Sequence, residues 1–204
     1  MQTRKLHRNR KLFSDHYLEN ILPNDPRWTL SLEEAEAFLN WLQDLYADER
    51  DQLAAYNEAQ LRDHWFTPIL KRIGHTLERE ASIPGLEAYA KRPDYVFFPD
   101  EAARQTAAIS QNEEAYAAEA LAVGEVKRWD MPLGKKRPGG GPSFEDRNPS
   151  WQIDYYIRAT KLDWGILTNG RVWRLCHKDT SHRLQIYYEV DLMQCLEEAA
   201  PDGL

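Results

Sequence analysis

The chain has 204 residues, of which 42% are hydrophobic, and a formal net charge of −7 at pH 7; it is expected to fold, and not to bind phosphates over its whole surface. No apolar run is long enough to span a membrane, and the basic N-terminus lacks the apolar segment of a signal peptide. With two cysteines that form no metal-binding motif, Cys176 and Cys195, the sequence predicts a cytoplasmic protein that does not associate with membranes.

The first third of the chain is predicted to be helical after an irregular arm. Two prolines interrupt residues 17–28, so this stretch is expected to be irregular. Ser31 and Glu34 have the spacing of a capping box and precede apolar residues at helical spacing, which predicts a helix that begins near Ser31. A second helical segment is expected over residues 59–80, with Pro68 as a candidate boundary.

Strand signals dominate several later segments. Runs of aromatic and β-branched residues predict strands within 93–98, 121–129 and 183–192. Asn169 and Gly170 separate two further β-rich runs within 164–175, and an Asn-Gly pair in this position is the signature of a type I′ hairpin.

Helices and one long loop are predicted between these strands. The Ala- and Glu-rich segment 100–120 favours an exposed helix. Prolines and glycines predict a loop over 132–149, which ends with Asn148 and Pro149 as the N-cap and first residue of a helix. This order of elements predicts an α/β (α+β) fold with a central mixed β-sheet flanked by helices.

Glu125 and Lys127 stand near the end of an otherwise apolar strand, "LAVGEVKRW". Residues two apart in a strand point to the same face, so these charged side chains project together. Taken alone, the pair is most simply a strand-end salt bridge. Asp94, however, opens the preceding strand, and neighbouring strands could place it beside Glu125. Two adjacent carboxylates repel unless a cation lies between them, and Mg²⁺ prefers such oxygen ligands.

Pro93-Asp94, followed later in the chain by Glu125 to Lys127, resembles the motif of the PD-(D/E)xK nuclease superfamily. Gln152 and Tyr156, in "QIDYY", match the Q-x-x-x-Y element of the N-terminal nuclease domains of type I and type IIG restriction enzymes. The resemblance implies a restriction-endonuclease-like core in residues 59–192. Residues 1–58 would be an N-terminal arm and helical extension, and 193–204 a C-terminal tail or linker.

The resemblance also implies a set of metal ligands. Asp94 and Glu125 would bind Mg²⁺, with the carbonyl of Val126 as a further ligand, and Mn²⁺ is expected to substitute. An acidic residue from the preceding helix sometimes joins such sites, and Glu78 and Glu80 are the candidates here.

The remaining implied roles concern catalysis and DNA. Lys127 would be the catalytic lysine, while Gln152 and Tyr156 would line the site; without the resemblance, these two would be interpreted as a helix face packed on the sheet. Basic residues after the catalytic strand are candidates for DNA contacts, although a solvated surface loop explains them equally well. These residues are Arg128, Lys135, Lys136, Arg137 and Arg147.

The sequence thus predicts a Mg²⁺-dependent DNA endonuclease of a restriction-modification or phage-defence enzyme, either free-standing or the N-terminal piece of a larger protein. Its expected partners are double-stranded DNA, methyltransferase, helicase or specificity domains or subunits, and a second copy of the chain during cleavage. One alternative is a non-catalytic DNA-binding or scaffold module that keeps the nuclease fold. The other is a metal-independent protein-interaction domain in which Glu125 and Lys127 form only a salt bridge.

Overall fold

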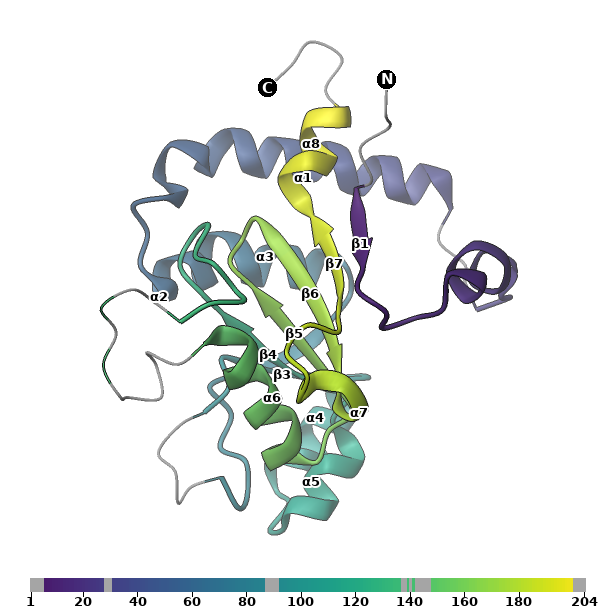
Figure 1. Ribbon diagram of the computed structural model, residues 1–204. Coiled ribbons are helices and arrows are strands. Elements are labelled where there is room, and N and C mark those ends of the chain that lie inside the picture. Colours follow the sequence, from purple (N-terminus) through teal and green to yellow (C-terminus); the bar gives the residue numbers. More distant parts are fainter. Residues whose placement is uncertain are drawn as a thin grey trace.

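The computed structural model describes residues 6–27, 31–86, 92–136, 139, 141 and 148–199. Its centre is a seven-stranded sheet in the order β1-β7-β6-β5-β4-β3-β2 (Figure 1). Strands β4 and β5 are parallel, and the other neighbouring strands are antiparallel. The mixed sheet with flanking helices confirms the predicted α/β fold. The strands are β1 (His7–Asn9), β2 (Thr76–Arg79), β3 (Tyr95–Phe98), β4 (Ala122–Val126), β5 (Trp164–Thr168), β6 (Val172–His177) and β7 (Tyr188–Asp191).

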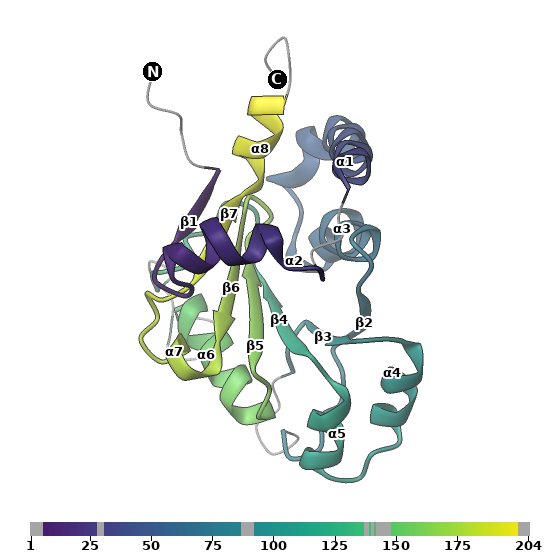
Figure 2. The ribbon, with the colours of Figure 1, turned by 90° about the vertical axis from the view of Figure 1, so that its right-hand side faces the viewer.

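Helices cover both faces of this sheet. Figure 2 shows α1 and α3 on one side and α6 and α7 on the other. The helices are α1 (Leu32–Leu53), α2 (Glu58–Leu61), α3 (Thr67–Arg72), α4 (Glu101–Ala108), α5 (Glu113–Glu119), α6 (Pro149–Thr160), α7 (Lys178–Ser181) and α8 (Leu192–Ala199). Shorter helical turns are η1 (Tyr17–Ile21), η2 (Leu22–Asn24) and η3 (Arg62–Phe66).

The alternation of side chains along β3 and β4 divides the core into two layers. Val96 and Val123 point toward α6 and join one apolar cluster, whereas Tyr95 and Phe97 join the cluster on the side of α1 and α3. Gly124 lies under these aromatic rings, where an added Cβ would come within 2.9 Å of the Phe97 ring. The alternation therefore fixes which residues at the end of β4 face α6.

Several local predictions for the helices are confirmed. Ser31 caps α1, and its side chain and that of Glu34 form the predicted capping box. Asn148 caps α6, with Pro149 in its first turn. Pro68 does not break the helical region; it lies in the first turn of α3, directly after η3, where its missing N–H costs little.

The predicted helix over residues 59–80 is wrong at its C-terminal end. Helix α3 ends at Arg72, Gly74 adopts a positive φ of 89°, and Thr76–Arg79 form the edge strand β2. Pairing with β3 gives this segment a hydrogen-bonded partner that local helix propensity could not reveal. The segment 100–120 is likewise split, into α4 and α5, rather than one continuous helix.

The predicted type I′ hairpin is also wrong in its turn type. That turn requires positive φ at both central residues, but of Asn169 and Gly170 only the glycine has one. Thr168 pairs with Trp173, so the connection is longer than two residues. The Asn169 side chain accepts hydrogen bonds from the N–H groups of Arg171 and Val172, and these two bonds stabilise the turn.

The two ends of the described chain are more ordered than predicted. His7–Asn9, in the predicted N-terminal arm, pair with β7, and the helical turns η1 and η2 form within the stretch 17–28 that was expected to be irregular. Most of the expected tail from residue 193 onward forms α8, in which Leu196 is fully buried. The domain boundaries at residues 58 and 192 stay predictions. Among the described residues, no helix is long and apolar enough to cross a membrane.

Candidate active site

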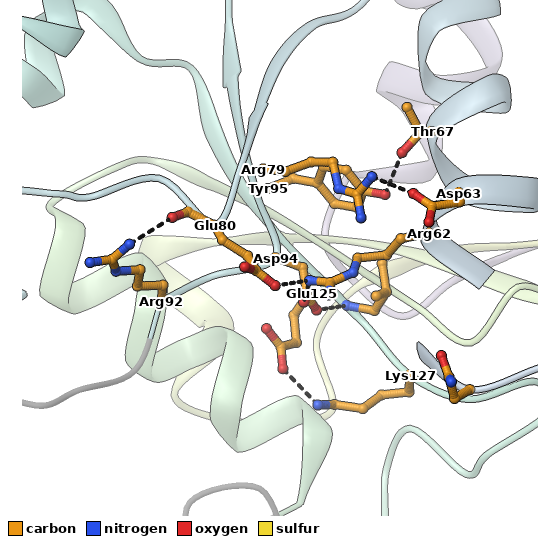
Figure 3. Close-up of polar contacts among 12 residues, drawn as sticks. Arg62, Asp63, Thr67, Arg79, Glu80, Arg92, Asp94, Tyr95, Glu125 and Lys127 are labelled. Atoms are coloured by element: carbon orange, nitrogen blue, oxygen red, sulfur yellow. Dashed lines mark hydrogen bonds and ion pairs between the residues drawn. The ribbon is translucent and has the colours of Figure 1, made fainter. Parts of the chain in front are cut away.

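Asp94 lies directly before β3, beside the end of β4. Tyr95 pairs with Gly124 and Val96 with Val123, so one further step of this antiparallel register brings Asp94 opposite Glu125. The Asp94 carbonyl accepts a hydrogen bond from the Glu80 N–H at 3.1 Å, and its carboxylate Oδ2 accepts one from the Val126 N–H at 2.9 Å. The backbone thereby places the two carboxylates at one end of the strand pair (Figure 3).

Glu125 and Lys127 project from β4 toward the α6 side, as the strand periodicity predicts. The Lys127 N–H donates to the Thr168 carbonyl at 2.8 Å, so the ordered backbone continues past the end of β4. The Lys127 ammonium donates to Glu125 Oε1 at 2.6 Å, and the two side chains are 6% and 8% exposed. Strand β4 and this hydrogen-bonded extension of its backbone therefore hold the buried pair of Glu125 and Lys127 in place.

Burial and like charge perturb the acid–base properties of this group. Burial, reinforced by the charge of Asp94, raises the pKa of Glu125 to about 8, although Lys127 opposes the change. Burial also raises the pKa of Asp94, against the effects of the Val126 N–H and of Arg62. Burial works against charge on Lys127, but Glu125 and Glu58 together raise its pKa. Arg62 and Lys127 thus do not fully offset burial and like charge at these two carboxylates, and a divalent cation would add positive charge there.

Glu58 is an acidic neighbour that the sequence analysis missed. It is the first residue of α2, whose N-terminus is fixed by a capping box between Asn57 and Gln60. Its charge contributes to the raised pKa values of Asp94, Glu125 and Lys127. The spacing of Asn57 and Gln60 could have identified the helix start, but no sequence signal indicates that this helix end faces the sheet.

Glu78 and Glu80, the acidic candidates from sequence, have other partners. Glu78 lies on β2 and forms an ion pair with Arg104 at 3.5 Å. Glu80, with its side chain 59% exposed, pairs at 2.7 Å with Arg62, which also contacts Asp94 at 2.6 Å. Arg62 is thus a second neighbour of Asp94 that the sequence analysis did not identify.

Gln152 and Tyr156 lie one turn apart on α6, and both are buried in the layer beneath the site. The Tyr156 hydroxyl donates to the Arg92 carbonyl at 3.0 Å, two residues before Asp94. Tyr156 therefore fixes the backbone that carries Asp94. Because the Gln152 side chain is fully buried, a direct contact with DNA would require it to become exposed.

The basic residues proposed for DNA contacts are only partly described. Arg128, Lys135 and Lys136 are exposed and follow β4 in the chain. Arg137 and Arg147 lie outside the described residues. The DNA-contact roles of all of these residues stay predictions.

The donor set fits a hard divalent cation. Asp94 and Glu125 bring carboxylate oxygens, the ligands that Mg²⁺ prefers, to the same end of the β3–β4 pair. Burial raises the pKa of both carboxylates, and the charge of Asp94 raises that of Glu125 further. In the described part of the chain, no three His, Cys, Asp or Glu side chains already converge as a metal cluster. Lys127 and Arg62 currently contact these two carboxylates, so metal binding would need these ion pairs to rearrange. The role of the Val126 carbonyl stays a prediction.

No protein-family model matches the chain, and neither a curated protein nor a solved structure matches it. What the chain does must therefore be inferred from the chemistry of Asp94, Glu125 and Lys127 and of the groups around them.

Proposed function

We propose that the protein is a Mg²⁺-dependent DNA endonuclease that hydrolyses phosphodiester bonds. The observation that carries this proposal is the convergence of Asp94 and Glu125 from adjacent strands, with Lys127 on the same face. Mn²⁺ is expected to substitute for Mg²⁺, because both accept oxygen ligands.

Each group has a defined task in this proposal. Asp94 and Glu125 would hold the metal, and Glu58 would add negative charge to the same place. A bound Mg²⁺ would lower the pKa of a coordinated water and stabilise charge on a phosphoryl oxygen. Lys127, whose pKa is raised, stays protonated and is suited to stabilising the negative charge that develops during attack. Tyr156 would keep Asp94 in position through the Arg92 backbone.

The proposed substrate is double-stranded DNA, and the proposed context is a restriction-modification or phage-defence enzyme. The motif order in the sequence supports this context, together with the exposed Arg128, Lys135 and Lys136 that follow β4 in the chain. Methyltransferase, helicase or specificity domains or subunits would then be partners. With one such site among the described residues of each chain, double-strand cleavage would favour two copies of the chain acting together.

Cleavage of supercoiled plasmid in Mg²⁺ tests this function. Asp94→Asn, Glu125→Gln and Lys127→Ala should each reduce cleavage by about 100-fold or more. Glu114→Gln is the matched control, because Glu114 is exposed on α5 and makes the same change of charge away from the site. Metal-dependent cleavage that persists in the site variants, or its absence from the wild type, would contradict the proposal.

One observation favours a non-catalytic DNA-binding or scaffold module as a second candidate. Both carboxylates already have cationic partners, Arg62 on Asp94 and Lys127 on Glu125, so the cluster can be neutralised without metal. This candidate predicts that the wild type shifts duplex DNA in a gel but neither cleaves it nor gains thermal stability with Mn²⁺.

A further inference from the structure

Arg62 contacts two acidic side chains through a single nitrogen. Its Nη1 lies 2.6 Å from Asp94 Oδ1 and 2.7 Å from Glu80 Oε1. The Arg62 side chain is 11% exposed and that of Asp94 17%, whereas that of Glu80 is 59% exposed. The guanidinium therefore links an inner carboxylate of the site with an outer one at the surface.

The inner contact satisfies a carboxylate that is otherwise costly to bury. Asp94 Oδ2 accepts the Val126 N–H, and Oδ1 accepts from Arg62, so each oxygen has a donor. The guanidinium group of arginine stays protonated in proteins, so the contacts of Arg62 with Asp94 and Glu80 are both ion pairs. Arg62 therefore stays cationic and partly neutralises the oxygen that a metal would need.

We propose that Arg62 is a built-in counter-ion that occupies Asp94 until a divalent cation replaces it, and that Glu80 retains Arg62 after the exchange. This inference rests on the proposed metal-dependent function and concerns the control of the same site. It makes Arg62 a positioning residue that sets metal affinity, rather than a catalytic residue.

The exchange follows from charge and geometry. A divalent cation bound to Asp94 would lie a few ångströms from the guanidinium, and the two positive charges repel. Because the same nitrogen already contacts Glu80, Arg62 can leave Asp94 without losing its ion pairing. Lys127 differs, because its ion-pair partner is Glu125, which lies only two residues before it in the chain.

Binding of Mn²⁺ to the full chain, measured by isothermal titration calorimetry, tests this inference. Arg62→Gln should bind Mn²⁺ on the order of tenfold more tightly than the wild type, because it removes the competing charge. Arg62→Lys keeps the charge and should stay near the wild type. Arg79→Gln is the matched control, because Arg79 lies on β2 and pairs with Asp63, the neighbour of Arg62 in η3. It should also leave the affinity near that of the wild type.

Glu80→Gln supplies a second test that does not depend on the folding of Arg62→Gln. Removing the outer partner leaves Arg62 on Asp94, so Mn²⁺ binding should weaken several-fold. Glu78→Gln is its control: it removes the same charge from the neighbouring β2, where Glu78 pairs with Arg104 instead. Equal weakening in both variants would show a general charge effect and would overturn the role of Glu80.

The outcomes separate this inference from the proposed function. If Asp94→Asn abolishes Mn²⁺ binding while Arg62→Gln binds no more tightly than the wild type, the counter-ion role is refuted and the metal site stands. If neither the wild type nor Arg62→Gln binds Mn²⁺, the metal-dependent function fails, and the inference fails with it.

Discussion

Glu125→Gln should change how the stability of the metal-free protein depends on pH. The pKa of Glu125 rises from its ordinary value of 4.5 to about 8, mainly because of burial. At a pH between these two pKa values, Glu125 is protonated in the native protein but ionised in the unfolded chain. Unfolding then releases a proton, so rising pH favours unfolding, and the favourable contribution is lost as pH rises through about 8.

The magnitude follows from the size of this change. A difference of about 3.5 between the two pKa values corresponds to at most ~5 kcal/mol, at 1.36 kcal/mol for each pH unit. Asp94 can take up a proton instead and relieve the same repulsion, so we expect about 3 kcal/mol. Gln resembles the protonated acid in shape and does not ionise, so Glu125→Gln should remove this loss of stability.

Urea unfolding in EDTA, from about pH 5 to about pH 9, measures the effect. Relative to the wild type, Glu125→Gln should gain about 3 kcal/mol across this range. Glu114→Gln, on the exposed face of α5, should follow the wild-type curve. A constant difference between Glu125→Gln and the wild type at every pH would refute the placement of Glu125 as a buried carboxylate beside Asp94.

Three further changes test other parts of the site. Lys127→Met should reduce plasmid cleavage by about 100-fold. Mn²⁺ binding, measured by calorimetry, should stay the same or become tighter, because the variant loses a positive charge but no metal ligand. Loss of Mn²⁺ binding would contradict this role of Lys127. Tyr156→Phe removes the hydrogen bond to the Arg92 carbonyl and should cost about 1 kcal/mol of unfolding free energy, measured in urea, as well as lowering cleavage several-fold. If stability falls but cleavage does not, Tyr156 does not position Asp94. Gly124→Ala places a Cβ about 2.9 Å from the Phe97 ring and should lower the free energy of unfolding in urea by about 1–3 kcal/mol. An unchanged midpoint of urea unfolding would show that the ring has room to move.

The parts of the site that could be predicted from the sequence depend on strand geometry. Side chains two apart on a strand share a face, which placed Glu125 with Lys127, and a short strand after Asp94 suggested the neighbouring position. The first inference needs only the period of the backbone, whereas the second also needs β3 and β4 to be neighbouring strands. The capping residues Ser31 and Asn148 were equally predictable, because a helix start needs local acceptors for its free N–H groups.

The contacts that were missed depend on tertiary packing. Thr76–Arg79 have no strand signal strong enough to outweigh the preceding helix, and they become β2 because β3 offers a free edge. Glu58 and Arg62 reach the site because the α2–η3 segment packs across the end of the sheet, and Leu61 and Trp65 anchor it in the core. Nothing within the sequence window around Arg62 encodes a partner that lies 32 residues away.

The charge balance of the site reconciles a folded metal-free protein with metal-dependent chemistry. Asp94, Glu125 and Glu58 bring three negative charges to one partly buried place, which would be costly without cations. Lys127 and Arg62 supply two positive charges, and the proton that Glu125 retains near neutral pH supplies the third. On this account a divalent cation would enter by releasing that proton and displacing Arg62 toward Glu80. Metal affinity should therefore rise with pH until Glu125 is ionised, and Arg62→Gln should raise it at every pH.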